Sequence, residues 1–159
     1  MNIFVRESTP NDMPKVLGLI KELAVFEKSP NAVEVTVEIL IKEGFGLNPL
    51  FTCFVAEVDQ KIVGMALIYY RFSTWKGRSL HLEDLIVKEK MRGSGIGKAL
   101  YTKVIEYAYE KKVKRIEWAV LNWNKDAIQF YKKSGAIVMK DWYITHMEEA
   151  GIKNYIAKL

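Results

Sequence analysis

The sequence predicts a single mixed α/β (α+β) domain, residues 1–159, in which helices flank a sheet. Three observations lead to this fold class. Strand-like runs and runs with apolar residues every three or four positions follow one another along the chain. Two strand-like runs, Phe51 to Val58 and Ile62 to Phe72, are joined by only a short polar connection, as in an antiparallel hairpin. The length of 159 residues suits one core, and no repeat, low-complexity segment or linker divides it.

The first part of the chain is predicted to form a strand and two helices. Thr9 precedes Pro10, and Asp12 follows three residues after the threonine, which is typical of a helix start with a capping pair. Apolar residues then recur at helical spacing. The predicted elements are a strand from Ile3 to Arg6, a helix from Pro10 to about Phe26, a loop from Glu27 to Val35, and a short helix from Val37 to Glu43 with Thr36 as its cap and Gly44 as its end.

The remainder of the chain alternates between strands and helices. A polar loop, Ser73 to Arg78, ends the hairpin, and a glycine-rich stretch follows the next strand. The predicted strands after the hairpin are Leu80 to Val87, Ile116 to Leu121 and Trp142 to Met147. The predicted helices run from the glycine-rich stretch to about Lys112, from Asn124 to Ser134 before Gly135, and, weakened by Gly151, within Glu148 to Leu159.

The composition is that of a globular domain, with half of the residues apolar and 27% charged. The single Cys53 cannot form an internal disulfide and lies in an apolar run, which indicates a buried residue in a reducing compartment. No apolar run is long enough to span a bilayer, and the amino terminus resembles a strand rather than a signal peptide. We therefore expect a cytoplasmic protein with no membrane partner and no metal site.

The net charge of +5 is concentrated in two clusters. One, which includes Arg92 and Lys98, surrounds the glycine-rich stretch and suits a multiply phosphorylated cofactor. The other, Lys111 to Arg115, follows the long helix, where positive charge is favourable. Neither cluster is accompanied by an aromatic, zinc-ligand or recognition-helix pattern, so a basic nucleic-acid-binding protein is a minor alternative and we expect no nucleic-acid partner.

The glycine-rich stretch joins a strand to the longest helix. The first N–H groups of a helix have no internal partner, and glycine lets an anion approach the main chain, so the stretch is suited to hold a phosphate. It is not a Walker A loop, because Arg92 and Ala99 stand where that motif has glycine and Ser or Thr. It is not a dinucleotide fingerprint, because Lys98 replaces the third glycine. A tight turn without a ligand is the alternative. The stretch consists of Arg92, Gly93, Ser94, Gly95, Ile96, Gly97 and Lys98.

A second motif lies in the predicted helix that begins at Asn124. By helical spacing, Asn124 and Tyr131 share a face with Ala127 and Ile128, so an amide and a phenol point the same way. The alternative is that Asn124 only caps the helix and that Tyr131 is a core residue.

The two motifs together resemble the core of the GNAT acetyltransferase superfamily. The matching order is a strand, Arg-x-x-Gly-x-Gly from Arg92, a long helix, a strand, and Asn-x-x-Ala-x-x-Phe-Tyr-x-x-x-Gly from Asn124. Further segments resemble the diamine (spermidine/spermine) or thialysine acetyltransferase branch, so the resemblance runs from Arg6 to about Trp142. These segments are Ile20 to Ala24 with Glu27, Glu43 to Gly46, and Trp75 before Leu82 to Asp84.

The resemblance implies a GNAT fold with a central mixed, mostly antiparallel twisted sheet of about seven strands, in which the fourth and fifth strands splay apart. It also implies acetyl-CoA as the acetyl donor and, since the family is commonly dimeric, a homodimer with Trp142 to Ile144 near the contact. The implied cofactor contacts are the backbone of Leu85, Ile86 and Val87 together with Asn124 for the pantetheine arm, the main-chain N–H groups from Arg92 to Lys98 for the pyrophosphate, and Tyr131 beside the acetyl thioester.

Acetyl transfer to an amine requires a proton acceptor, because an alkylamine with a pKa of about 10.4 is protonated at neutral pH. The family match selects Glu83 for this role, directly or through a water, and Tyr131 as the donor of a proton to the leaving thiolate. A backbone N–H near Leu85 is suited to stabilise the oxyanion. His81 shares the strand face of Glu83 and is a lesser candidate for the base. Asp84, as the neighbour of Glu83 on a strand, is expected to face the opposite side, so that only one of the two lines the site directly.

The acceptor is expected to be a small amine bound near Glu27, Trp75, Glu83 and Asp84. Glu27 matches an acidic position of the family, with a plain surface carboxylate as the alternative, and Asp84 is either near the acceptor or structural. Ser73 and Thr74 stand where the polyamine branch has Asp-Pro, which weakens the case for a long polycation. The expected acceptor is therefore a small polyamine or a lysine- or thialysine-like amine. A protein amino terminus, a protein lysine and a non-catalytic CoA-binding module remain as alternatives.

Overall fold

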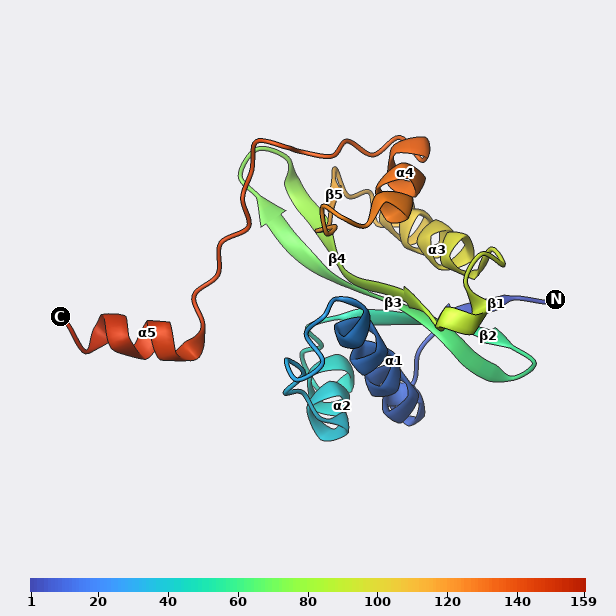
Figure 1. Cartoon of the computed structure of the whole chain (residues 1–159), viewed down its shortest axis with the longest axis horizontal. Helices are drawn as coiled ribbons and strands as arrows, with labels where there is room; N and C mark the ends of the chain where they lie inside the picture. Colours follow the sequence, from blue (N-terminus) through green and yellow to red (C-terminus); the bar gives the residue numbers. More distant parts are fainter. The chain divides into compact units, whose positions relative to one another are not determined.

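A five-stranded sheet forms the centre of the first of two units into which the chain divides (Figure 1). The computed structural model describes residues 1–159; the first unit is Met1–Ala119 and the second is Val120–Leu159. The first unit contains every strand and the first three α-helices, whereas the second contains α4 and α5. The mixed α/β class predicted from the sequence is confirmed.

The sheet is mostly antiparallel, as predicted, with the strands in the order β1-β2-β3-β4-β5. The first four strands pair antiparallel, and β5 pairs parallel to β4. The strands are β1 Phe4–Glu7, β2 Thr52–Val58, β3 Lys61–Ser73, β4 Gly77–Val87 and β5 Ile116–Glu117.

The prediction of about seven strands is wrong, since the sheet has five. The strand predicted from Ile116 to Leu121 is only two residues long, and residues 142–147 form no strand. Alternating apolar side chains favour an extended chain, but a strand also needs a neighbouring strand to bind its N–H and C=O groups. In the single chain, residues 142–147 pair with no other strand.

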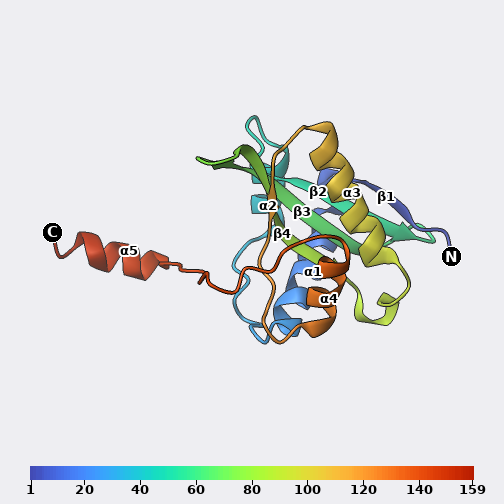
Figure 2. The same ribbon diagram turned by 90° about the horizontal axis from the view of Figure 1, so that it is seen from above.

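Helices cover both faces of the sheet in the first unit (Figures 1 and 2). One face packs against α1, Met13–Phe26, and α2, Val37–Phe45, through a buried apolar cluster. The other face packs against α3, Ile96–Glu110, whose buried side chains repeat at helical spacing. The buried residues of the first cluster include Val16, Leu19, Cys53, Val55, Leu67 and Ile86, and those of α3 are Ile96, Leu100, Tyr101, Val104 and Ala108.

The helices begin next to the capping residues predicted from the sequence, although the first turn after Thr9 is not α-helical. The Asp12 carboxylate accepts the N–H of Thr9 at 2.7 Å, but Pro10–Asp12 is a 3-10 turn and the α-helix begins at Met13. The Thr36 hydroxyl accepts the N–H of Ile39 at 3.3 Å and caps α2 as predicted.

The sequence predicted that Gly44 ends α2. This prediction is wrong, because the helix continues to Phe45. A Cβ atom at Gly44 would lie 2.5 Å from the ring of Phe51. The glycine therefore makes room for a neighbouring side chain instead of breaking the helix.

The second unit consists of two helices, α4 at Lys125–Lys133 and α5 at Glu149–Ile156. Asn124 is the N-cap of α4, and Gly135, with a φ of 95°, follows its end, as the sequence predicted. None of the helices is both long and apolar enough to cross a lipid bilayer.

Candidate active site

The glycine-rich loop lies between β4 and α3, as predicted. Gly93 and Gly95 have φ values of 75° and 88°, in the left-handed region that L side chains rarely adopt. The loop starts after the 3-10 turn Glu89–Met91, and Gly95 is the N-cap of α3, with its carbonyl oxygen accepting the N–H of Ala99 at 3.0 Å. The two glycines therefore let the chain turn abruptly from the strand into the helix.

The start of α3 fits a diphosphate group. The N–H groups of Ile96, Gly97 and Lys98 precede the first N–H that bonds within the helix, so they are available to an anion. A Cβ atom at Gly97 would lie at an ordinary contact distance of 3.7 Å from Val87, so packing does not require glycine there. Its missing side chain leaves the main chain open to a bulky ligand, and the exposed Lys98 adds positive charge.

Arg92 holds the loop to its surroundings. Its Nε donates to the carbonyl oxygen of Val87 at 3.1 Å, and its guanidinium lies 4.7 Å from the centre of the Phe26 ring, a cation–π contact. Its backbone N–H donates to the carbonyl oxygen of Glu89 at 3.1 Å. The Arg92 side chain therefore connects the loop with the end of β4 and the end of α1.

One edge of β4 is open beside this loop. The strand β5 pairs only with Leu80 and His81, so residues 82–87 of β4 have no strand partner on that edge. The fourth and fifth strands are thus unpaired beyond His81, which agrees with the splayed strands that the family resemblance implies. Along such an edge, alternate residues present their N–H and C=O groups outward. Leu85, Ile86 and Val87, the predicted contacts for the pantetheine arm, form the end of this open edge.

A β-bulge at Glu83 changes the side on which the carboxylates lie. In the ladder, Leu67 of β3 pairs with Asp84 and Ile68 pairs with Leu82, which leaves Glu83 as an extra residue. Asp84 therefore shares the sheet face of Leu67, which belongs to the apolar cluster under α1 and α2. The hydroxyl of Tyr69, which pairs with His81 on the same face, donates to Glu83 at 2.8 Å. The expectation that Glu83 and Asp84 face opposite sides is wrong, because the bulge interrupts the strand alternation on which it rested.

Three carboxylates, Glu27, Glu83 and Asp84, form what we term the acidic cluster, on the α1 side of β4. Loss of solvent, together with the neighbouring charges of Glu83 and Glu27, raises the pKa of Asp84 to about 6. Burial also raises the pKa of Glu27, the C-cap of α1. Like charges held this close, and partly shielded from water, favour binding of a cation.

Polar side chains of β3, β4 and β5 lie next to the acidic cluster along the sheet. His81 Nε2 lies 3.5 Å from the Glu83 carboxylate, and His81 Nδ1 lies 3.2 Å from the Arg71 guanidinium. Arg71 in turn lies 3.6 Å from Glu117. Burial, together with the hydrogen bond to Glu83, raises the pKa of Tyr69 to about 12, whereas burial lowers the pKa of His81. Tyr69 and Arg71 were not predicted as site residues, since a tyrosine and an arginine in a strand are typical of sheet surfaces and belong to no motif.

The predicted substrate residue Trp75 is not brought to the acidic cluster. It lies at the tip of the β3–β4 hairpin and is 81% exposed. The strands pair as far as Ser73 and Gly77, so the tip is six residue pairs beyond the Leu67–Asp84 pair, or about 20 Å along the strands. Within one chain, the acidic cluster is therefore formed without Trp75.

Of the two predicted residues of the second unit, Tyr131 lies on α4 and Asn124 is the N-cap of that helix. The Asn124 side chain accepts the N–H of Ala127 at 3.3 Å, so the capping role is observed. Tyr131 is buried, and its ring centre lies 5.4 Å from that of Phe130 in an edge-on contact.

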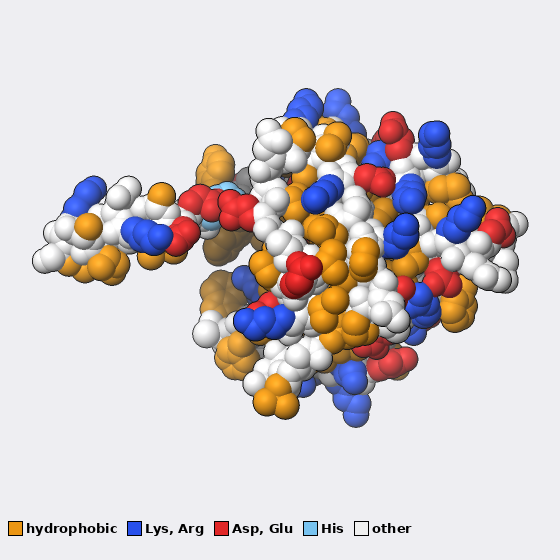
Figure 3. Space-filling model, turned by 90° about the horizontal axis from the view of Figure 1, so that it is seen from below, with side chains coloured by type: hydrophobic (Ala, Val, Ile, Leu, Met, Phe, Trp, Pro, Cys, Tyr) orange, Lys and Arg blue, Asp and Glu red, His pale blue; other side chains and the backbone are white.

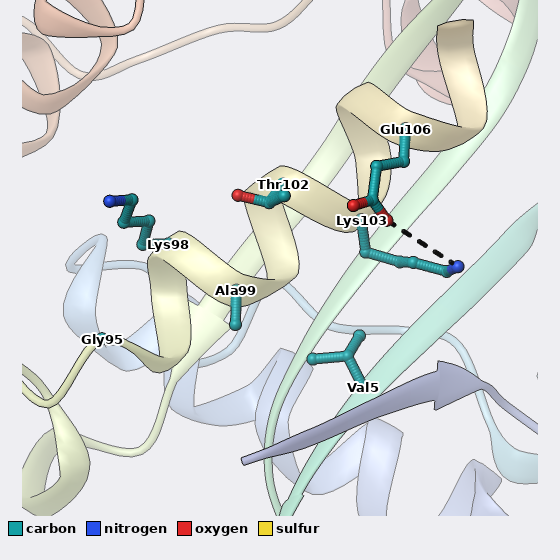
Figure 4. A pocket seen from close by; sticks show the side chains of 7 residues that line it. All are labelled: Val5, Gly95, Lys98, Ala99, Thr102, Lys103 and Glu106. Atoms are coloured by element: carbon teal, nitrogen blue, oxygen red, sulfur yellow. Dashed lines mark ion pairs between the residues drawn. The ribbon is translucent and has the colours of Figure 1, made fainter. Parts of the chain in front are cut away.

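A surface groove of about 430 Å³ lies between β1 and α3 (Figure 4). Lys98, Thr102 and Lys103 line it from the helix and Val5 lines it from the strand, and Lys103 pairs with Glu106 at 4.0 Å. No residue of the acidic cluster lines this groove. On the face of the molecule shown in Figure 3, lysine and arginine side chains are interspersed with acidic ones and do not form one basic patch.

Comparison with known proteins identifies the family. Residues 19–136 match the family described as Acetyltransferase (GNAT) family. A thialysine N-epsilon-acetyltransferase of Bos taurus is 36% identical over 98% of this chain and 98% of its own length. The spermidine/spermine N(1)-acetyltransferase-like protein 1 of Homo sapiens is 35% identical over 84% of this chain and 20% of that protein.

A solved structure agrees with the fold. An integron cassette protein from V. cholerae superposes with a TM-score of 0.80 over 100% of this chain and 99% of that chain, at 22% identity. The strand β4, the glycine-rich loop, the long helix α3 and the α4 motif all lie within the residues that match the family. The chain therefore belongs to the GNAT family of N-acetyltransferases, in the branch that includes the thialysine N-epsilon-acetyltransferase and the spermidine/spermine N(1)-acetyltransferase-like protein.

Proposed function

We propose that the chain transfers an acetyl group from acetyl-CoA to a primary amine of a small polyamine or of a lysine- or thialysine-like acceptor. The observation that carries this proposal is the acidic cluster beside the open edge of β4. A cationic amine that enters there meets Glu27, Glu83 and Asp84 together. The similarity to a thialysine N-epsilon-acetyltransferase and to a spermidine/spermine N(1)-acetyltransferase-like protein supports an acceptor with a second charged group.

The donor is proposed to lie along the loop and the open edge. When bound, acetyl-CoA supplies an activated acetyl thioester. The N–H groups at the start of α3 are suited to its pyrophosphate, and the backbone of Leu85 to Val87 is suited to its pantetheine arm. Asn124 and Tyr131 of α4 are proposed to complete this site, so that the two units work as one catalytic domain.

Glu83 is proposed to remove the proton that the acceptor ammonium must lose before its nitrogen attacks the acetyl carbon directly, with donor and acceptor bound together. A primary alkylamine has a pKa of about 10.4, so it arrives charged. Asp84 and Glu27 are proposed to hold the acceptor, including its second cationic group where it has one. Tyr131 is proposed to donate a proton to the leaving sulfur, since a tyrosine hydroxyl with a pKa of about 10 suits a thiolate.

We further propose a homodimer that acts in the cytoplasm. The single cysteine, Cys53, is buried and unpaired, which suits a reducing compartment. The homodimer is proposed because several large apolar side chains in residues 142–147 are exposed in the single chain.

The function is tested by measuring thiol release from acetyl-CoA and the mass of the product. Spermidine, putrescine, thialysine, lysine and a short peptide with a free amino terminus and an internal lysine form the acceptor panel. The expected result is turnover on a small amine. The product should be heavier than the amine by about 42 mass units, the mass that an acetyl group adds. Acetylation of the peptide alone would favour a protein acetyltransferase. Tight CoA binding without turnover on any acceptor would favour a non-catalytic CoA-binding module.

A further inference from the structure

The Glu83 carboxylate is held by one of its two oxygens. Tyr69 donates its hydroxyl hydrogen to Oε2 at 2.8 Å, and His81 Nε2 lies 3.5 Å from the same oxygen. The other oxygen, Oε1, has no hydrogen bond or ion pair within the protein. The Glu83 side chain is half-exposed, so without these two contacts it would sample several rotamers.

Arg71 determines which nitrogen of His81 carries the hydrogen. Its guanidinium has only donors, and it lies 3.2 Å from His81 Nδ1, so Nδ1 must accept. A neutral imidazole has one donor and one acceptor, which places its hydrogen on Nε2, the nitrogen that faces Glu83. Glu117 lies 3.6 Å from Arg71 and favours this position of the guanidinium.

We infer that Tyr69 and His81 are positioning residues that fix Glu83 through Oε2 and leave Oε1 for the acceptor amine, with Arg71 fixing the tautomer of His81. The inference rests on the proposed role of Glu83. It also removes His81 from consideration as the base, since neither ring nitrogen has a free lone pair. The charged groups that face His81 are Arg71 of β3, Glu83 of β4 and Glu117 of β5. Burial and Arg71 lower the pKa of His81 while Glu83 and Glu117 raise it, and the net lowering agrees with a neutral ring at pH 7.

The first test is the tautomer, which does not depend on turnover. The chain has only two histidines, His81 and His146, so a His146→Gln variant assigns the signals. Long-range ¹H–¹⁵N correlation spectra of the labelled full-length protein at pH 7.5 are expected to show a neutral ring with its hydrogen on Nε2. In an Arg71→Met variant, the fixed tautomer is expected to give way to a mixture. A hydrogen on Nδ1, or a charged ring, in the wild type would overturn the inference.

The second test is the pH profile of kcat/KM. Because a donor to a carboxylate lowers its pKa, Tyr69→Phe is expected to move the acidic limb up by roughly one pH unit and to lower kcat by about tenfold. The matched control is Tyr70→Phe, since Tyr70 is the next residue, faces α3 and contacts the hydroxyl of Tyr107 at 3.4 Å. The control is expected to keep the wild-type profile.

A pair of variants at position 81 separates positioning from packing. His81→Gln retains a side-chain donor and is expected to keep more activity than His81→Ala, with circular dichroism confirming that both are folded. Equal profiles for Tyr69→Phe and Tyr70→Phe, or equal rates for the two His81 variants, would contradict the inference. Failure of the wild type to acetylate any amine would instead contradict the proposed function, and the tautomer result would still stand.

Discussion

Glu83 combines a half-exposed carboxylate with a fixed position next to the open strand edge. If it accepts the acceptor's proton, Glu83→Gln should lower kcat by about a hundredfold or more, because a glutamine cannot take up a proton. Affinity for CoA should stay the same, as judged by calorimetry. Glu110→Gln, at an exposed position at the end of α3, is the control and should retain wild-type rates. A Glu83→Gln enzyme with an unchanged rate would assign the base elsewhere.

Asp84 links the site to stability through pH. Its pKa is raised from 3.8 to about 6 in the folded chain, so the folded state binds the proton more tightly than the unfolded state. The free energy of unfolding that depends on this group should therefore be highest below about pH 4 and fall as the pH rises to about 6. Above about pH 6, the charged Asp84 carboxylate lowers the free energy of unfolding, and this penalty is at most about 3 kcal/mol.

Asp84→Asn removes that penalty. The variant should be more stable than the wild type at pH 7, and the difference should disappear near pH 4, as measured by urea unfolding across this range. An equal difference at every pH would show that the Asp84 side chain affects stability by packing instead of by titration. The same variant should raise the KM for the amine, since a cation loses one of three carboxylates.

At the scale of single residues, the residue types indicated the chemistry of the site. They did not indicate the directions in which the side chains point. Glu83 and Glu27 were predicted as acidic residues of one site, and the structure brings them to the same side of the sheet as Asp84. The shared face of Glu83 and Asp84 could not be predicted, because it depends on which residues of β3 pair with β4. Tyr69 became visible only once the pairing with His81 was known.

At the scale of elements, the loop before α3 distinguishes two uses of glycine. Gly95→Ala places a side chain at a φ of 88°, which should cost about 1 kcal/mol of stability and lower the melting temperature. Gly97→Ala meets only an ordinary contact with Val87, so its stability should be close to that of the wild type. Its added methyl group lies at the start of α3 and should weaken CoA binding severalfold, as measured by calorimetry. Unchanged CoA affinity in Gly97→Ala would argue against a diphosphate at this helix start.

Elements that carry their own end signals were predicted well. Thr36, Asn124 and Gly135 mark the ends of α2 and α4 in both the sequence and the structure. Elements that depend on distant partners were predicted poorly. The alternation of apolar residues in 116–121 and 142–147 indicates that the chain can be extended there. Whether a strand forms depends on a neighbouring strand that is available for pairing, and the local sequence does not show whether there is one.

At the scale of the whole molecule, the exposed residues of the second unit give a testable prediction. Trp142, Tyr143 and Ile144 are 70%, 94% and 71% exposed, an unusual arrangement for large apolar side chains. If the protein is a homodimer that buries them, light scattering should give about twice the mass of one chain. Tyr143→Asp should shift the population toward the monomer, whereas Tyr109→Phe, exposed on α3, should not. A monomeric wild type at high concentration would contradict the prediction.

The bulge at Glu83 has a consequence for how such enzymes can arise or be designed. Leu82 and Leu85 pair with Ile68 and Ala66, which face α3, so both leucines face that helix although two residues separate them. Removing Glu83 would leave a regular ladder in which each of these leucines keeps its partner. A side chain that accepts a proton can therefore be added to an existing strand as a one-residue insertion. None of the core residues needs to be substituted. For a designer, the position opposite Leu67 and Ile68 is an insertion point at which chemistry and packing can be varied independently.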